Sequence, residues 1–325
     1  MNTKIMIGKQ DNVLTASQVP SYLRDPGIIF GYRKTDQSWS YYIKSIFQLH
    51  NETLNIWTHV VAVLILTVVL YNGTGLYNFY SEKQSWPVLV FGLCCLFSTC
   101  SSVLAHLFHS KNIDIHYNLF LLDYVGVSLY GYANGTIALY CFSDRLTYNI
   151  IESSYVIAHW LFCWFDFAVI CVTKMNTSPN WTRKIAMIAC FTFHAVLLTA
   201  TVARKYWLFL NGDTRYTMSI ANYNWIYFMF FLQAMSYGSH LPEIFFPGVF
   251  DIIGQSHQIF HVVATSTQIL QINAMHFEIS NGNSSYGDPS LSFLAISAIT
   301  LIIADFCTIY ILRWYFPIDR SKKEK

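Results

Sequence analysis

The sequence predicts an all-α integral membrane protein, a polytopic bundle of helices, and two observations lead to this prediction. Of its 325 residues, 54% are hydrophobic and only 12% are charged, whereas soluble domains carry about 25% charged residues. A soluble protein of this size still needs a wettable surface, so a large core does not explain the deficit. The apolar residues also gather in runs of about 20, the length that an α-helix needs to cross a bilayer.

We expect eight of these runs to form membrane-spanning helices. The seventh is the least apolar, because it contains Ser, Thr, Gln and two His, whereas the eighth is strongly apolar. The expected spans are residues 55–71, 86–108, 117–142, 150–173, 184–203, 222–240, 256–274 and 291–315. The chain then divides into an N-terminal region (1–54), a seven-helix core (55–274), a loop (275–290), an eighth span (291–315) and a basic tail (316–325).

The N-terminal region is polar and has no uninterrupted apolar segment of the kind found in a secretory signal peptide. Within it, residues 39–48 mix aromatic side chains with Lys44, which predicts an amphipathic helix on the membrane surface. Fifteen of the 20 Lys and Arg residues fall on the side of the predicted bundle that holds both termini. The positive-inside rule therefore favours a cytosolic location for both termini.

Cysteine and charge content exclude two other kinds of protein. The eight cysteines all fall in apolar stretches without CxxC spacing, so we expect small buried side chains and no disulfide framework. The net charge of +2 gives no basic excess that would indicate nucleic-acid binding.

A small set of His and Asp residues interrupts the apolar spans at related spacings. His257 and His261 stand at i and i+4, on one face of a helix. Ser102 and His106 repeat that spacing near the end of the second span, and Asp123 lies near the start of the third. Imidazole and carboxylate together are ligands suited to zinc, and a catalytic zinc keeps one position for water.

The direction of each span places these residues in one layer of the membrane. The second span runs towards the cytosol, and the third and seventh run away from it. His106, near the end of the second span, therefore lies at the same depth as Asp123 and His257, near the starts of the third and seventh. The same layer also contains Glu52, Asn55 and His59. A single intramembrane His often only joins helices, but several ionisable groups at one depth are costly and usually functional. The pattern therefore predicts one shared metal site.

Four further polar residues lie within apolar spans. Asp166 and Asp305 sit in the middle of spans without an obvious partner, and their roles stay open. His159 and His194 are isolated in their spans, and such residues are more often hydrogen-bonded interior side chains than metal ligands.

Several stretches resemble the progestin and adipoQ receptor family, which belongs with the adiponectin receptors and haemolysin III proteins. They occur in the expected order and cover about two-thirds of the chain. They are FQLHNETLNIWTH (47–59), SVLAH (102–106), LLDYVGVSLY (121–130), LPEIFFPG (241–248) and GQSHQIFH (254–261). GYRKTDQSWSYY (31–42) and an eighth span are similar to the membrane progestin receptor branch. The chain departs from that branch at Asn273, where the branch typically has the acidic residue of a QLEA motif.

The resemblance implies a seven-helix adiponectin-receptor-like core with an intramembrane zinc ion. By this resemblance His106, His257 and His261 bind the zinc, Asp123 contacts it through water, and Ser102 assists at the metal. It also implies a receptor for a progestogen-like steroid or other lipid ligand, at the plasma membrane, which signals to a G protein or other cytosolic effector.

The alternative is a zinc-dependent lipid amide hydrolase of the ceramidase type, or one protein with both roles. In that case Asp123 would accept a proton from water and Ser102 would support the reacting oxygen. A structural zinc needs the same three histidines as a catalytic zinc. Asp123 is therefore the residue that distinguishes a catalytic from a structural zinc, because a water held by Asp123 would leave the metal open.

Overall fold

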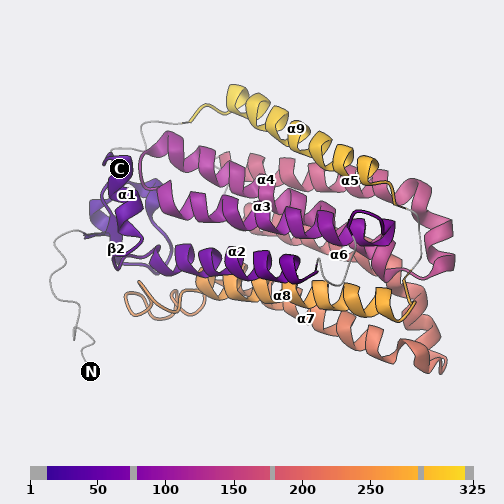
Figure 1. Ribbon diagram of the computed structural model, residues 1–325. Helices are drawn as coiled ribbons and strands as arrows, with labels where there is room; N and C mark the ends of the chain where they lie inside the picture. Colours follow the sequence, from indigo (N-terminus) through magenta and orange to yellow (C-terminus); the bar gives the residue numbers. More distant parts are fainter. Residues whose placement is uncertain (1–12, 74–78, 176–179, 285–288, 319–325) are drawn as a thin grey trace.

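The computed structural model describes residues 13–73, 79–175, 180–284 and 289–318, and in these ranges the chain is almost entirely helical. Eight long helices form one bundle (Figure 1), as the sequence predicts. Seven of them close into a ring, in which each packs on the next and α8 returns to α2. They are α2 (Thr53–Gly73), α3 (Trp86–Phe108), α4 (Ile113–Ile137), α5 (Arg145–Met175), α6 (Asn180–Leu210), α7 (Thr217–Ser239) and α8 (Ser256–Ser280).

The last helix, α9 (Leu291–Tyr315), lies outside the ring against α5, α4 and α3. Polar side chains attach it to its neighbours: the Trp160 indole donates to the backbone carbonyl of Ser297, 3.0 Å away, and the Trp164 indole donates to the Thr308 hydroxyl, 2.9 Å away. Tyr132 of α4 also bonds the Ser297 hydroxyl at 2.5 Å. Hydrogen bonds of this kind are a common way of joining helices in lipid.

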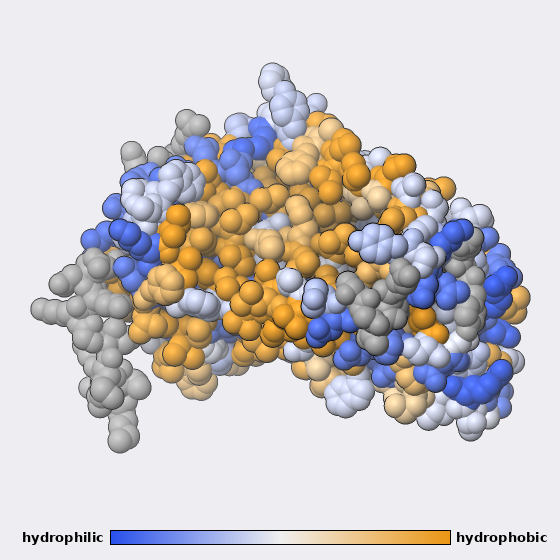
Figure 2. All heavy atoms as spheres, viewed as in Figure 1, coloured by the Kyte–Doolittle hydropathy of each residue, from blue (hydrophilic) through white to orange (hydrophobic). Residues whose placement is uncertain are grey.

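On the face shown in Figure 2, the surface of the bundle is mostly apolar over its middle and more hydrophilic towards its ends. By length and composition, α2, α3, α5 and α9 could each cross a membrane. The other four long helices carry more polar residues and pack in the same bundle. A bilayer favours this distribution, with apolar side chains facing lipid and backbone groups satisfied within helices. The chain is an integral, multi-pass membrane protein.

Helix ends differ from the predicted spans where polar residues find partners inside the bundle. The spans predicted at 86–108 and 291–315 match α3 and α9. α8 instead continues to Ser280, into the segment expected to be a loop, and α6 continues to Leu210. Lys205, which lies just beyond the span expected at 184–203, is therefore helical and fully buried. The eight cysteines are free, and all but Cys100 and Cys307 are buried.

A small N-terminal cap covers one end of the bundle (Figure 1). Strands β1 (Val13–Thr15) and β2 (Phe30–Arg33) pair antiparallel, and helix α1 (Trp39–Ser45) follows within the stretch predicted to be amphipathic. The cap is joined to the loop before α8 by Asp251, whose carboxylate accepts hydrogen bonds from the backbone amides of Ile29 and Phe30, both at 2.9 Å. The cap thus lies at the end of the bundle where α3 ends and α8 begins.

Candidate metal centre

Three imidazoles meet where the end of α3 faces the first two turns of α8. The Nε2 atom of His257 lies 3.1 Å from that of His106 and 3.2 Å from that of His261. His106 and His261 are buried, with 3% and 1% of their surface exposed. In a tetrahedral zinc site with Zn–N bonds of about 2.0–2.1 Å, two nitrogens lie roughly 3.3 Å apart. The three histidines therefore have the spacing of a zinc ligand set.

The second nitrogen of two of these rings has a hydrogen-bond partner that sets its tautomer. His106 Nδ1 lies 2.7 Å from Glu52 Oε2, and His261 Nδ1 lies 3.1 Å from the Thr58 hydroxyl oxygen. The Thr58 hydroxyl itself donates to the backbone carbonyl of Leu54, 2.7 Å away, so its oxygen is free to accept. Each ring then carries its proton on Nδ1 and turns an unprotonated Nε2 towards the other two rings, as metal-binding histidines do.

Glu52, immediately before α2, is the carboxylate that holds His106 in place. Burial alone would raise the pKa of Glu52, but hydrogen bonds with His106 and His109 hold this pKa well below its usual value. Asn55 also donates to Glu52 Oε2, 2.9 Å away. The Glu52 carboxylate accepts the hydrogen bond from Nδ1 of His106, 2.7 Å away. The sequence places Glu52 in the same membrane layer as the three histidines but does not show its contact with His106. The feature that could have indicated this role is an acidic residue directly before an apolar span.

The N-terminal cap fixes the turn of α3 that carries His106. The buried guanidinium of Arg33 donates to the backbone carbonyls of His106 and Leu107, at 2.6 and 2.7 Å. The last carbonyls of a helix have no hydrogen-bond partner within the helix and carry partial negative charge. A cation at this position donates hydrogen bonds to them and compensates the negative end of the helix dipole. The conformation of the cap is thus coupled to the position of His106.

Acidic and amide side chains fix the start of α8 in the same way. The Glu243 carboxylate accepts from the backbone amide of Ser256, 2.9 Å away, and from its hydroxyl. The Gln258 side-chain oxygen accepts from the amides of Gly254 and Gln255, at 2.7 and 3.3 Å. An acidic acceptor at a helix N-terminus satisfies free amides and favours the helix dipole. These hydrogen bonds join residues of the stretches 241–248 and 254–261. They orient the turn of α8 that carries His257.

Asp123 and Ser102 stand beside the three nitrogens without joining them. The cluster of ligand atoms within 4.8 Å of one another consists of His106, His257 and His261. Asp123, on α4, is close enough to act electrostatically on His106. Ser102 is buried one turn before His106 on α3. The centre therefore offers three nitrogen ligands, with a carboxylate at longer range.

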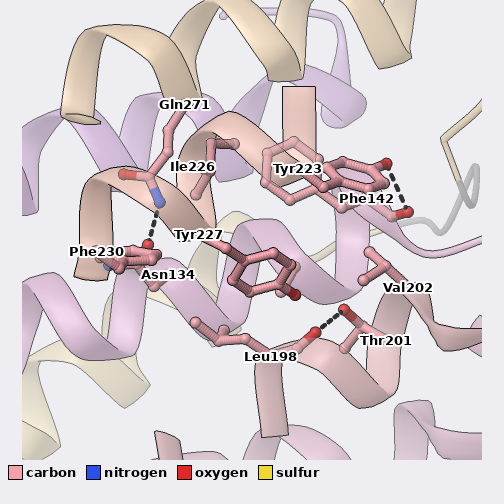
Figure 3. A pocket seen from close by; sticks show the side chains of 11 residues that line it. Asn134, Phe142, Leu198, Thr201, Val202, Tyr223, Ile226, Tyr227, Phe230 and Gln271 are labelled. Carbon is pink, nitrogen blue, oxygen red and sulfur yellow. Dashed lines mark hydrogen bonds between the residues drawn. The ribbon is translucent and has the colours of Figure 1, made fainter. Parts of the chain in front are cut away.

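A narrow cavity lies further along the bundle, between α4, α6, α7 and α8 (Figure 3). Its enclosed volume is small, about 30 Å³, which is room for roughly one or two water molecules. Gln271 donates a hydrogen bond to Asn134 at its wall and accepts one from Tyr130, 2.8 Å away. Tyr227 and Phe230 add aromatic surface. Gln271 follows His261 by ten residues of α8, which is about 15 Å at 1.5 Å per residue.

Comparison with known proteins supports the resemblance seen in the sequence. The profile of the family described as Haemolysin-III related matches residues 47–272. Membrane progestin receptor alpha-B of Danio rerio is 29% identical over 306 residues, which cover 92% of this chain and 85% of that protein. Membrane progestin receptor beta of Mus musculus is 32% identical over 265 residues, with coverage of 80% and 74%. Membrane progestin receptor beta of Homo sapiens is 29% identical over 317 residues, with coverage of 95% and 89%.

Proposed function

Because the chain belongs to the Haemolysin-III-related family, we propose that it is a membrane receptor for a progestogen-like steroid, with a zinc ion bound among its helices. The ligand class is taken from the relatives, which are named membrane progestin receptors. The observation that carries the proposal is the arrangement on α8, which bears two of the three converging imidazoles and also lines the cavity. One helix thus connects a candidate metal centre with a candidate ligand site.

In this proposal His106, His257 and His261 hold the zinc, Asp123 contacts it through water, and Ser102 supports the site. The spacing of the three nitrogens and the hydrogen bonds on His106 and His261 favour this assignment. Zinc would crosslink α3 and α8, because His106 comes from the first and the other two ligands from the second.

The steroid would enter the cavity from the lipid and place a polar group near Gln271. The cavity is narrow, so the ligand must separate α6 and α7 from α4 and α8 to bind. A ligand that binds the wider conformation better shifts the population towards it. We place the receiving effector, a G protein or another cytosolic protein, at the end of the bundle that carries the cap and the metal centre, with the receptor in the plasma membrane.

Membranes that contain the full chain are expected to bind radiolabelled progesterone saturably. Gln271→Leu should weaken this binding about tenfold, since a lost hydrogen bond that leaves polar partners unpaired costs about 1–3 kcal/mol. Ser266→Ala, at an exposed position of the same helix, is the matched control and should leave affinity unchanged. Absence of saturable binding in the unsubstituted protein would overturn the steroid assignment, and equal affinity of Gln271→Leu would exclude this cavity as the site.

One observation favours a second function, the hydrolysis of a lipid amide. Within the part of the chain that the structure describes, three nitrogens meet at the centre and Asp123 stays outside them, as in catalytic zinc sites that keep a position for water. A bound zinc would supply polarisation of a carbonyl and activation of water. Asp123 would hold the proton taken from water, and Ser102 would donate a hydrogen bond to the reacting oxygen.

The hydrolase role is tested by adding a short-chain ceramide to purified protein and measuring released fatty acid. Asp123→Asn should lower the rate at least a hundredfold, because general-base catalysis contributes about 10²–10⁴-fold, while zinc content and progesterone binding stay unchanged. Asp114→Asn, in the first turn of the same helix, serves as control. A rate in Asp123→Asn equal to that of the unsubstituted protein would reject the proposed base.

A further inference from the structure

A second group of potential ligands lies on α5 and α6, away from the centre described above. His159, Cys163 and Asp166 stand at i, i+4 and i+7 of α5, on one face of that helix. His194 of α6 faces them, with its ring centroid 4.9 Å from that of His159. Donor atoms of His159, Cys163 and His194 all lie within 4.8 Å of one another. Two helices thus bring two imidazoles and a thiol to one point inside the bundle.

The backbone of α4 leaves room for these side chains at two glycines one turn apart. A Cβ atom at Gly135 would lie 2.0 Å from the ring of His159, which no side chain could tolerate. A Cβ at Gly131 would lie 3.3 Å from His194 and 3.6 Å from the Cys163 sulfur. All three donor side chains therefore point at the same bare stretch of α4. Close backbone approach of this kind uses the absence of a side chain at glycine.

Several buried polar atoms around this cluster lack a hydrogen-bond partner among the described residues. They include Nδ1 of His159, a residue with 2% of its surface exposed, and one carboxylate oxygen of Asp166. Asp305 of α9 is fully buried, and both Asp residues act electrostatically on Cys163. A buried polar group without a partner is costly. A bound cation would offset that cost here.

The simpler alternative is that the two histidines only bond to the backbone. His159 Nε2 lies 3.0 Å from the carbonyl of Gly131 and can donate to it. That hydrogen bond does not explain why Cys163 and two carboxyl groups lie beside the two histidines. The same nitrogen lies 3.5 Å from the Cys163 sulfur, and a tetrahedral zinc with bonds of about 2.05 Å to nitrogen and 2.3 Å to sulfur predicts roughly 3.5 Å. A zinc ion on this nitrogen would take the place of the proton that it otherwise donates to Gly131.

We propose that His159, Cys163 and His194 form a second zinc site, independent of the first and of the receptor function. Two imidazoles and a thiolate select zinc over calcium or magnesium, which prefer oxygen ligands. Cys163 binds as thiolate, and its proton leaves to solvent when the metal enters. An oxygen of Asp166 lies 3.9 Å from His194 Nδ1, close enough to interact electrostatically with a bound cation. The ion would join α5 to α6, as the first site joins α3 to α8.

Cobalt(II) substitution of the purified full-length protein tests this site separately from the first. The first centre has no sulfur ligand, so a thiolate-to-cobalt charge-transfer band in the near ultraviolet that depends on Cys163 reports the second site. Cys163→Ser should abolish the band and lower bound zinc by one equivalent per chain. Cys171→Ser, a buried position two turns further along α5, is the matched control and should keep both. His257→Ala should keep the band although it loses the first metal.

His194→Gln supplies a second variant that keeps the size and polarity of the side chain. It should weaken the charge-transfer band and reduce zinc content as Cys163→Ser does, while monodisperse elution shows that the bundle is folded. A protein that shows no thiolate band with cobalt would overturn the proposal. Equal zinc content in the unsubstituted protein and Cys163→Ser would overturn it as well, and would assign the cluster to hydrogen bonding within the bundle.

Discussion

Replacing His257 by alanine is expected to remove the zinc from the centre formed with His106 and His261. Its Nε2 is within 3.2 Å of both other nitrogens, so its loss leaves only two protein ligands. Zinc binding to a complete protein site is worth about 10–16 kcal/mol. If three ligands share this energy, losing one weakens binding by roughly 10²–10⁴-fold. Zinc content per chain, measured by mass spectrometry after dialysis against a chelator, checks this directly.

The control is His276→Ala, which alters a histidine at the other end of α8, where its ring bonds the Ser280 hydroxyl. It should keep the metal. Both variants are best compared in a Cys163→Ser background, so that zinc at the proposed second site does not mask the loss. If His257→Ala retained the same zinc content as His276→Ala in that background, the three imidazoles would be a hydrogen-bonded cluster and the proposed centre would be rejected.

The sequence predicted the eight helices and which of their ends would meet, because hydrophobic length in a membrane allows few alternatives. His106 and His257 are 151 residues apart in the chain, yet the direction of their spans places them at one depth. The HxxxH spacing then places His257 and His261 on one face of α8. The depth of each residue follows from the chain alone, and this was enough to group the three histidines.

The contacts of Glu52 and Arg33 could not be predicted, because they depend on how each helix is rotated and what covers its end. Glu52 reaches His106 because α2 packs beside α3. Arg33 reaches the same turn because the cap folds over that end of the bundle. The cluster of His159 and Cys163 with His194 was missed for a related reason. Their spacing on α5 is visible in the sequence, but only the packing of α5 against α6 shows that His194 faces them.

Glu278→Leu is expected to destabilise the protein strongly, because it breaks a buried ion pair. Its carboxylate lies 2.8 Å from the Lys205 ammonium, and both side chains are completely buried. Lys205 also donates to the Tyr223 hydroxyl, 3.1 Å away. Removing the carboxylate leaves a buried ammonium without its counter-charge, which costs about 3–5 kcal/mol. Reversible unfolding in mixed detergent micelles should show this fall in the free energy of unfolding.

The double variant Lys205→Met with Glu278→Leu separates the cost of an unpaired charge from the value of the pair. Replacing a buried ion pair by apolar residues of similar volume is often neutral or stabilising, so the double variant should regain most of the lost stability. A double variant as unstable as Glu278→Leu would show that the pair itself stabilises the fold. Tyr223 lines the cavity and donates to the carbonyl of Phe142, 3.2 Å away. Because Lys205 holds that hydroxyl, the stable double variant should still bind progesterone more weakly, which would assign the pair to shaping the cavity.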